Sequence, residues 1–229
     1  MTRFLAGGID AVIFDMDGVL VDSEPLNFQA VRRLLARHGI AYAEDDNAAF
    51  IGMTDREHMR VLKVQHRLAP AEDRLVEDYL DLVLSLIPGG TQPMPGVPEV
   101  LLGIGRAGYR LAVASSAAPR VIAARLDALG VRPLFEVVAS GVEVPRGKPE
   151  PDVFLEAARR LGVSPRRCLV VEDSQNGLRA AKAAGMTCVV VPCRSTAGQD
   201  FSGADFRLEA LTGLLEILNR AGRPGAGRR

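Results

Sequence analysis

The chain has 229 residues, and its 28 Lys and Arg balance 28 Asp and Glu, so the formal net charge is zero. A chain of this length buries a substantial core, as one large domain or as a domain with an insertion. Zero net charge gives no overall field to draw in nucleic acid or an anionic membrane surface. We therefore expect neither as a partner, and any basic group that matters for function must act locally.

Cysteine, histidine and hydropathy patterns argue against further classes of protein. The cysteines are odd in number and lack C-x-x-C spacing, which disfavours a zinc site or a disulfide framework. No N-terminal apolar run has the length of a signal peptide and no segment has the length to span a bilayer, so we expect a soluble, cytoplasmic protein. The three histidines have helix-like surroundings without ligand spacing, and we expect all of them at the surface: His38, His58 and His66.

The first predicted strand, residues 11–14, is apolar and is followed by two carboxylates one residue apart, Asp15 and Asp17. Alternate strand residues point the same way and Gly18 lets the chain turn sharply, so both carboxylates can share one site. Two acids this close repel each other unless a cation lies between them or one keeps its proton. The pattern suggests a metal-assisted reaction in which one carboxylate attacks and the other moves protons. The alternative is an aspartate that only caps a turn, whereas the apolar residues 19–21 exclude a calcium loop.

Residues 24–92 contain no convincing strand, only helical patterns. Helices are predicted over 25–38 and 73–86, and the capping-box spacing of residues 54–57 predicts a helix that begins there. The Pro- and Gly-rich run 88–96 is interpreted as a linker back to the sheet. A helical insertion directly after the two carboxylates suggests a lid over the strand end, although an extra helical layer without a gating role remains open.

The rest of the chain alternates short apolar, β-branched runs with amphipathic helices. Strands buried on both faces and joined by helices imply an α/β fold with a doubly wound parallel sheet. Further strands are predicted over 111–114, 137–139, 168–171 and 188–191, and helices over 121–129, 151–161 and 175–184.

These patterns predict two domains and a tail. We expect residues 1–22 and 93–222 to form the sheet-containing core and residues 23–92 to form an inserted α-helical cap domain. The Gly-, Pro- and Arg-rich residues 223–229 are expected to be disordered.

Polar residues follow three of the predicted strands, at the sheet edge where open parallel sheets bind ligands. Ser115 and Ser116 precede a helix, so a hydroxyl and free backbone N–H groups there can hold a phosphate oxygen. Lys148 follows the next strand between Gly147 and a proline, and Glu172-Asp173 follow the strand after that. Four carboxylates at one edge require positive charge, and all-oxygen ligation suits Mg²⁺.

Taken together and in this order, these residues resemble the motifs of the haloacid dehalogenase superfamily, in particular its phosphoglycolate phosphatase and β-phosphoglucomutase-like branch. The matching motifs are Asp15-Met16-Asp17-Gly18, Ser115, Lys148 and Glu172-Asp173. The resemblance extends over nearly the whole chain, and the helical insertion follows the first motif as it does in that branch.

The resemblance implies a Mg²⁺-dependent phosphatase that hydrolyses small phosphomonoesters, such as sugar, polyol or phosphoglycolate-like phosphates, through an aspartyl-phosphate. It implies that Asp15 is the nucleophile, that Asp17 is the general acid and base, and that Ser115, Ser116 and Lys148 bind the phosphate. The implied metal ligands are Asp15, the backbone carbonyl of Asp17, Glu172 and Asp173.

Two other functions remain open. A sugar phosphate mutase uses the same core, but the turn 51–56 has Ile51 and Asp55 where the mutases usually have basic residues, and Arg56 comes one position late. A non-catalytic phosphate-binding regulatory module is a remote alternative, because no nucleophile or metal ligand is missing.

The residues that would set specificity are less clear from sequence. Candidates for contact with the substrate are Glu24, Asn27, Met53, Thr54 and Arg56. Thr54 can equally be a helix cap, and Glu24 can equally form a salt bridge near the junction with the insertion. The expected partner is a small phosphorylated metabolite, and nothing in the sequence requires more than a monomer.

Overall fold

The structure is a computed structural model that describes residues 8–43, 46 and 54–221. Its centre is a six-stranded sheet with the strand order β5-β4-β1-β6-β7-β8, in which all neighbouring strands are parallel. The strands are β1 (Ala11–Phe14), β4 (Arg110–Ser115), β5 (Val137–Ser140), β6 (Cys168–Glu172), β7 (Thr187–Val190) and β8 (Phe206–Arg207). The predicted doubly wound α/β class is confirmed.

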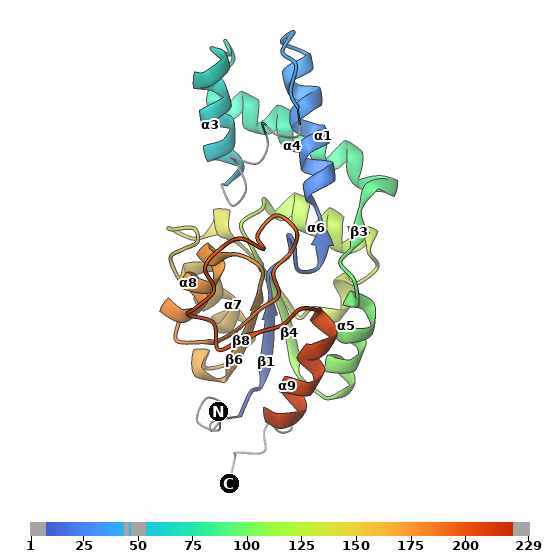
Figure 1. Cartoon of the computed structure of the whole chain (residues 1–229), viewed down its shortest axis with the longest axis vertical. Helices are drawn as coiled ribbons and strands as arrows, with labels where there is room; N and C mark the ends of the chain where they lie inside the picture. Colours follow the sequence, from blue (N-terminus) through green and yellow to red (C-terminus); the bar gives the residue numbers. More distant parts are fainter. Residues whose placement is uncertain (1–7, 44–45, 47–53, 222–229) are drawn as a thin grey trace.

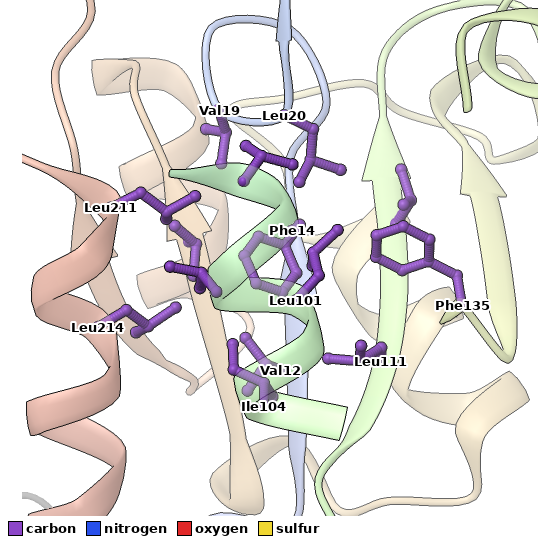
Figure 2. Packing of buried hydrophobic residues seen from close by; sticks show 14 of the residues in the cluster. Val12, Phe14, Val19, Leu20, Leu101, Ile104, Leu111, Phe135, Leu211 and Leu214 are labelled. Atoms are coloured by element: carbon purple, nitrogen blue, oxygen red, sulfur yellow. The ribbon is translucent and has the colours of Figure 1, made fainter. Parts of the chain in front are cut away.

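Helices cover both faces of this sheet, which is why the middle of each central strand is apolar. One face packs against α5 (Val97–Arg106), α6 (Pro119–Ala128) and α9 (Leu214–Ala221). Phe14, Leu101 and Leu214 meet there (Figure 2). The other face packs against α7 (Asp152–Leu161) and α8 (Gln175–Ala183).

A third apolar cluster lies apart from the sheet, in the helical portion at the top of Figure 1. It consists of α1 (Glu24–Ala36), α3 (Asp55–His66) and α4 (Glu72–Gly90). Leu34, Leu62 and Leu75 are buried in it, and Val121 of α6 packs against the same cluster. Helix α6 therefore contributes side chains to this cluster and to the cluster that covers one face of the sheet.

The chain passes twice between the sheet and the helical portion, and the two connecting segments pair with each other. β2 (Val21–Asp22) and β3 (Gln92–Pro93) form a two-stranded antiparallel ribbon. The prediction of a linker over 88–96 was wrong in part, because β3 lies inside it and α4 continues to Gly90 across a kink at Pro88 and Gly89. A strand of two residues is too short to show any periodicity in sequence.

Several short elements complete the fold. The 3₁₀ helices are Arg132–Leu134, Gly141–Glu143, Pro165–Arg167 and Leu211–Gly213. Cys168 and Cys188 are buried in strands β6 and β7, as their apolar neighbours predicted. Within the described residues, no helix combines the length and the apolar character that crossing a bilayer requires.

Candidate active site

The first motif lies in the turn that follows β1. Gly18 has a φ of +79°, and a Cβ at this position would lie 2.3 Å from Oδ2 of Asp173. A side chain is therefore excluded for two reasons, the backbone conformation and the close approach of Asp173. The glycine allows the loop after β1 to pack directly against the loop after β6.

Lys148 joins the ends of these two strands. Its Nζ donates hydrogen bonds to Oδ1 of Asp15 at 2.5 Å and to Oε1 of Glu172 at 2.6 Å. The Lys148 side chain is only 8% exposed. Burial lowers the pKa of the ammonium group, but the two carboxylates outweigh this effect, so the net shift of the Lys148 pKa is upward. The ammonium therefore stays charged between the two acids.

Glu172 is held rigidly at the end of β6. Its Oε2 accepts hydrogen bonds from the backbone N–H groups of Asp173 and Ser174, both at 3.0 Å, and from the Ser174 hydroxyl at 2.9 Å. The carboxylate occupies the space beside Gly177 in the first turn of α8. A Cβ on Gly177 would lie 1.7 Å from Oε1 of Glu172, so only glycine fits there.

Three buried carboxylates meet at this point, and their oxygens lie within 4.8 Å of one another: Asp15, Glu172 and Asp173. Burial, together with the neighbouring acids, raises the pKa of Asp15 and of Asp173 well above the ordinary range. Lys148 supplies one positive charge for the three acids. A divalent cation would balance the remainder, and a set of carboxylate oxygens is the kind of site that Mg²⁺ prefers. We call Asp15, Lys148, Glu172 and Asp173 the acidic end of the site.

Asp17 lies at the same cavity but has different partners. Nη1 of Arg125 donates to its Oδ1, and the Ser115 hydroxyl donates to its Oδ2 at 3.4 Å. Asp15 and Asp17 thus line the same cavity. Their side chains have different hydrogen-bond partners, Lys148 for Asp15 and Ser115 with Arg125 for Asp17. Such a separation allows two adjacent carboxylates to serve different roles.

The two serines at the end of β4, Ser115 and Ser116, differ in exposure. Ser115 is fully buried, and its hydroxyl accepts the backbone N–H of Ala117 at 3.1 Å. Ser116 and Ala117 line the cavity itself, just before α6 begins at Pro119. The residues that follow β4 thus line the cavity, whereas Ser115 is not among its lining residues.

Of the five candidates in the helical insertion, Glu24, Asn27 and Thr54 line the cavity. Thr54 is also the N-cap of α3, and the predicted capping box with Glu57 is confirmed. Arg56 is not among the lining residues, because its exposed guanidinium pairs with Glu72 and Asp73. Met53 lies outside the described residues.

Sequence reasoning missed several residues that line the cavity. Arg125 is 2% exposed and donates from Nη2 to Oδ1 of Asn27 at 2.6 Å. An arginine on the apolar stripe of the predicted helix 121–129 was the available signal. The prediction that all histidines lie at the surface was wrong for His58, which lines the cavity and whose pKa burial lowers to about 4. Asp55 and Tyr79 also line it.

We call Asn27, Thr54, Asp55, His58 and Tyr79 the helical wall of the cavity. They belong to α1, α3 and α4 or, in the case of Thr54, to the cap of α3. The acidic end, in contrast, comes from the end of strand β6 and from the loops that follow strands of the sheet.

The comparisons with known proteins agree with the motifs. Residues 9–185 match the family of haloacid dehalogenase-like hydrolases. The chain belongs to this family. The resemblance inferred from the motifs is thereby confirmed.

Two relatives and one solved structure of this family illustrate its range. The phosphorylated carbohydrates phosphatase of Thermotoga maritima is 37% identical over 182 residues, which cover 78% of this chain and 82% of that protein. Hexitol phosphatase B of Escherichia coli is 32% identical over 212 residues, 89% of this chain and 93% of that protein. A CbbY variant from Rhodobacter sphaeroides in complex with xylulose-(1,5)bisphosphate has a TM-score of 0.80 and 32% identity, covering 88% of this chain and 94% of that one. This haloacid dehalogenase-like protein is accordingly an enzyme that hydrolyses phosphoric monoesters.

Proposed function

We propose that this enzyme is a Mg²⁺-dependent phosphatase that hydrolyses small sugar or polyol phosphates through an aspartyl-phosphate on Asp15. One observation carries the proposal. Asp15 lies more than a hundred residues before Lys148 and Asp173 along the chain, yet the three residues meet at one cavity beneath the helical wall. Relatives that are named phosphatases of phosphorylated carbohydrates and hexitol phosphates support the substrate class.

The proposed reaction has two steps. In the first step a carboxylate oxygen of Asp15 attacks phosphorus, the bond from phosphorus to the leaving oxygen breaks, and Asp17 gives its proton to that oxygen. In the second step Asp17 takes a proton from a water molecule, and the resulting hydroxide attacks the phosphorus of the aspartyl-phosphate. Phosphate leaves and the Asp15 carboxylate is restored, so that the protons balance over one turnover.

The other residues of the site stabilise charge in both steps. Lys148 lies 2.5 Å from Asp15 and offsets the charge that builds up between the nucleophile and the phosphoryl group. Ser116 and Ala117 line the cavity, and the backbone N–H of Ser116 with the hydroxyls of Ser115 and Ser116 would be the donors to phosphoryl oxygens.

A bound Mg²⁺ would be held by the carboxylates of Asp15, Glu172 and Asp173 and by the backbone carbonyl of Asp17. It would reduce the repulsion between the anionic nucleophile and the anionic phosphate. The donor set fits this ion, because the three carboxylates are buried, lie within 4.8 Å of one another and share one ammonium.

We further propose that α1, α3 and α4 act as a cap domain formed by residues 23–92, with residues 1–22 and 93–222 as the catalytic core. The helical portion has an apolar cluster of its own, and it supplies the helical wall. Substrate specificity in this scheme depends on the cap, whereas the chemistry depends on the core.

The proposal is tested by phosphate release from p-nitrophenyl phosphate and from a panel of sugar and polyol phosphates, with Mg²⁺ and with EDTA. We expect release that requires Mg²⁺ and is lost in Asp15→Asn. A hexose bisphosphate that is isomerised without release of phosphate would instead identify a mutase. No turnover of any phosphomonoester would contradict the proposal altogether.

A further inference from the structure

We propose that Asp55 is a specificity-determining residue that excludes substrates with a second anionic group. The site would then accept one phosphate on an otherwise uncharged polyhydroxy compound. This inference rests on the proposed phosphatase function and adds the charge selectivity of the helical wall.

Few cationic side chains line the cavity. Among the described residues that line it, only Lys148 and Arg125 carry a permanent positive charge. Lys148 is already bonded to Asp15 and Glu172 at the acidic end. His58 is neutral at pH 7, because burial lowers its pKa to about 4. A second anion on the substrate would therefore depend on Arg125.

Arg125 is not available to such an anion. Its side chain is 2% exposed, Nη1 donates to Asp17 and Nη2 donates to Asn27 at 2.6 Å. To bind a second anionic group it would have to release one or both partners. Loss of the bond to Asp17 would leave that carboxylate without its positive partner at the centre of the reaction.

The other charged side chains at the helical side of the cavity are negative. Asp55 is the first residue of α3, half-buried, and lines the cavity close to Asp17 and Arg125. Burial and, to a smaller extent, the charge of Asp17 raise the pKa of Asp55 to about 6, although Arg125 acts in the opposite direction. Asp55 is therefore ionised at pH 7.5. Glu24 lines the same cavity. Outside the acidic end, three acids thus face one arginine that is already paired.

The part of the chain just before α3 supplies no positive charge that could offset these acids. Residues 44–53 read Glu-Asp-Asp-Asn-Ala-Ala-Phe-Ile-Gly-Met, a stretch with three acids and without Lys, Arg or His. Whatever their position, these residues add no positive charge. Hydroxyl groups of a substrate, in contrast, find hydrogen-bonding partners in Asn27, Asp55 and Tyr79 at the cavity.

The proposed charge selectivity would distinguish this enzyme from its structural neighbour CbbY. CbbY was solved with xylulose-(1,5)bisphosphate, a ligand with two phosphates. Here a second phosphate would bring further negative charge to a partly buried wall that is already acidic, and like charges in such surroundings repel strongly. We expect the enzyme to discriminate against it.

The test uses two substrates that differ at one carbon atom. Glucitol 6-phosphate has a hydroxymethyl group where 6-phosphogluconate has a carboxylate. With the full chain and Mg²⁺ at pH 7.5, we expect kcat/KM for glucitol 6-phosphate to exceed that for 6-phosphogluconate by about 10- to 100-fold, mainly through KM. Asp55→Asn should reduce this ratio about tenfold, whereas Asp55→Glu, which restores the charge, should retain it. Glu99→Gln, an exposed acid on α5 outside the cavity, is the matched control and should leave the ratio unchanged.

Each outcome has a distinct meaning. Equal use of both substrates by the unmodified enzyme, or a preference for 6-phosphogluconate, would overturn the inference and leave the phosphatase function standing. An unchanged ratio in Asp55→Asn would remove the role of Asp55. If the enzyme hydrolysed neither of these substrates, nor p-nitrophenyl phosphate, nor any member of the sugar and polyol phosphate panel, the proposed function would be refuted, and the inference with it. The measurement on the unmodified enzyme decides the charge selectivity even if the variants do not fold.

Discussion

The acidic end and the helical wall are built in different ways. The acidic end is linked across the sheet, because Lys148 donates to Asp15, Glu172 and the Ala114 carbonyl, which lie at or just after the ends of three strands. Residues of the wall lie on helices whose own core is separate. The groups that would react with phosphorus and those that would contact the rest of a substrate thus belong to parts of the chain with separate cores. A site built this way can retain its chemistry while its specificity changes.

The largest effect should follow a change at the acidic end itself. We expect Asp15→Asn to lower kcat/KM for p-nitrophenyl phosphate by at least about 10⁴-fold, because an amide is a poor nucleophile. Labelled substrate should give no acid-stable phosphoenzyme in this variant. Asp127→Asn, an exposed aspartate on α6 paired with Arg132, serves as the control. A phosphoenzyme trapped in Asp15→Asn would show that another residue attacks.

Asp17 lies between the two regions, since its neighbours Ser115 and Arg125 belong to the core while Arg125 also contacts Asn27 of α1. We expect Asp17→Asn to reduce kcat by about 10²- to 10⁴-fold, the usual cost of losing a general acid and base. Binding of inorganic phosphate, followed by calorimetry in the presence of Mg²⁺, should remain. Turnover close to that of the unmodified enzyme would remove Asp17 from the proton transfers.

A backbone position tests how rigid the acidic end must be. Gly177→Ala places a methyl group where Glu172 lies, and we expect it to lower the free energy of unfolding by about 1–3 kcal/mol and to reduce kcat along with it. Gly105→Ala is the matched control, because its Cβ would meet no atom within 4 Å inside helix α5. That substitution should stabilise the protein by about 0.5–1 kcal/mol. Equal behaviour of the two variants in urea unfolding would contradict the tight packing around Glu172.

The smallest effect concerns stability at the helical wall. The pKa of Asp55 is raised to about 6 in the folded protein from 3.8 in the unfolded chain, so the folded state holds the proton more tightly between these values. The resulting cost in stability is absent below pH 4, grows as pH rises through this window and is complete above pH 6. We expect Asp55→Asn to be more stable than the unmodified protein by about 1–2 kcal/mol at pH 7.5 and equally stable near pH 4. Thermal unfolding at both pH values measures this difference, and a variant that is less stable at pH 7.5 would mean that the charge at the start of α3 outweighs the burial.

The two regions also differ in how far the sequence predicted them. The acidic end was predictable, because an apolar strand followed by Asp15-Met16-Asp17-Gly18, or by Glu172-Asp173, marks both the strand and the sheet edge where it ends. The helical wall was predicted only in part. Asn27 and Thr54 line the cavity, but the roles of Arg125 and His58 depend on how α1 and α3 lie against α6, which no local pattern encodes.

The elements that the sequence analysis missed have local explanations. β2, β3 and β8 have two residues each, too few for an alternating pattern to repeat. Helix α5 has Pro98 at its start and two glycines, Gly103 and Gly105, which reduce its helix propensity. Its stability comes from the packing of Leu101 and Ile104 against the sheet.

The antiparallel pair of β2 and β3 has a consequence for how such an enzyme can evolve. The chain leaves the sheet and returns to it along one ribbon, so the two chain connections of the helical insertion lie side by side. An ancestral gene could therefore exchange this insertion, or lengthen its helices, without altering any parallel strand pairing. Grafting the corresponding helices of a relative between residues 22 and 92 is a practical route to new phosphatases that keep the same strand-end carboxylates.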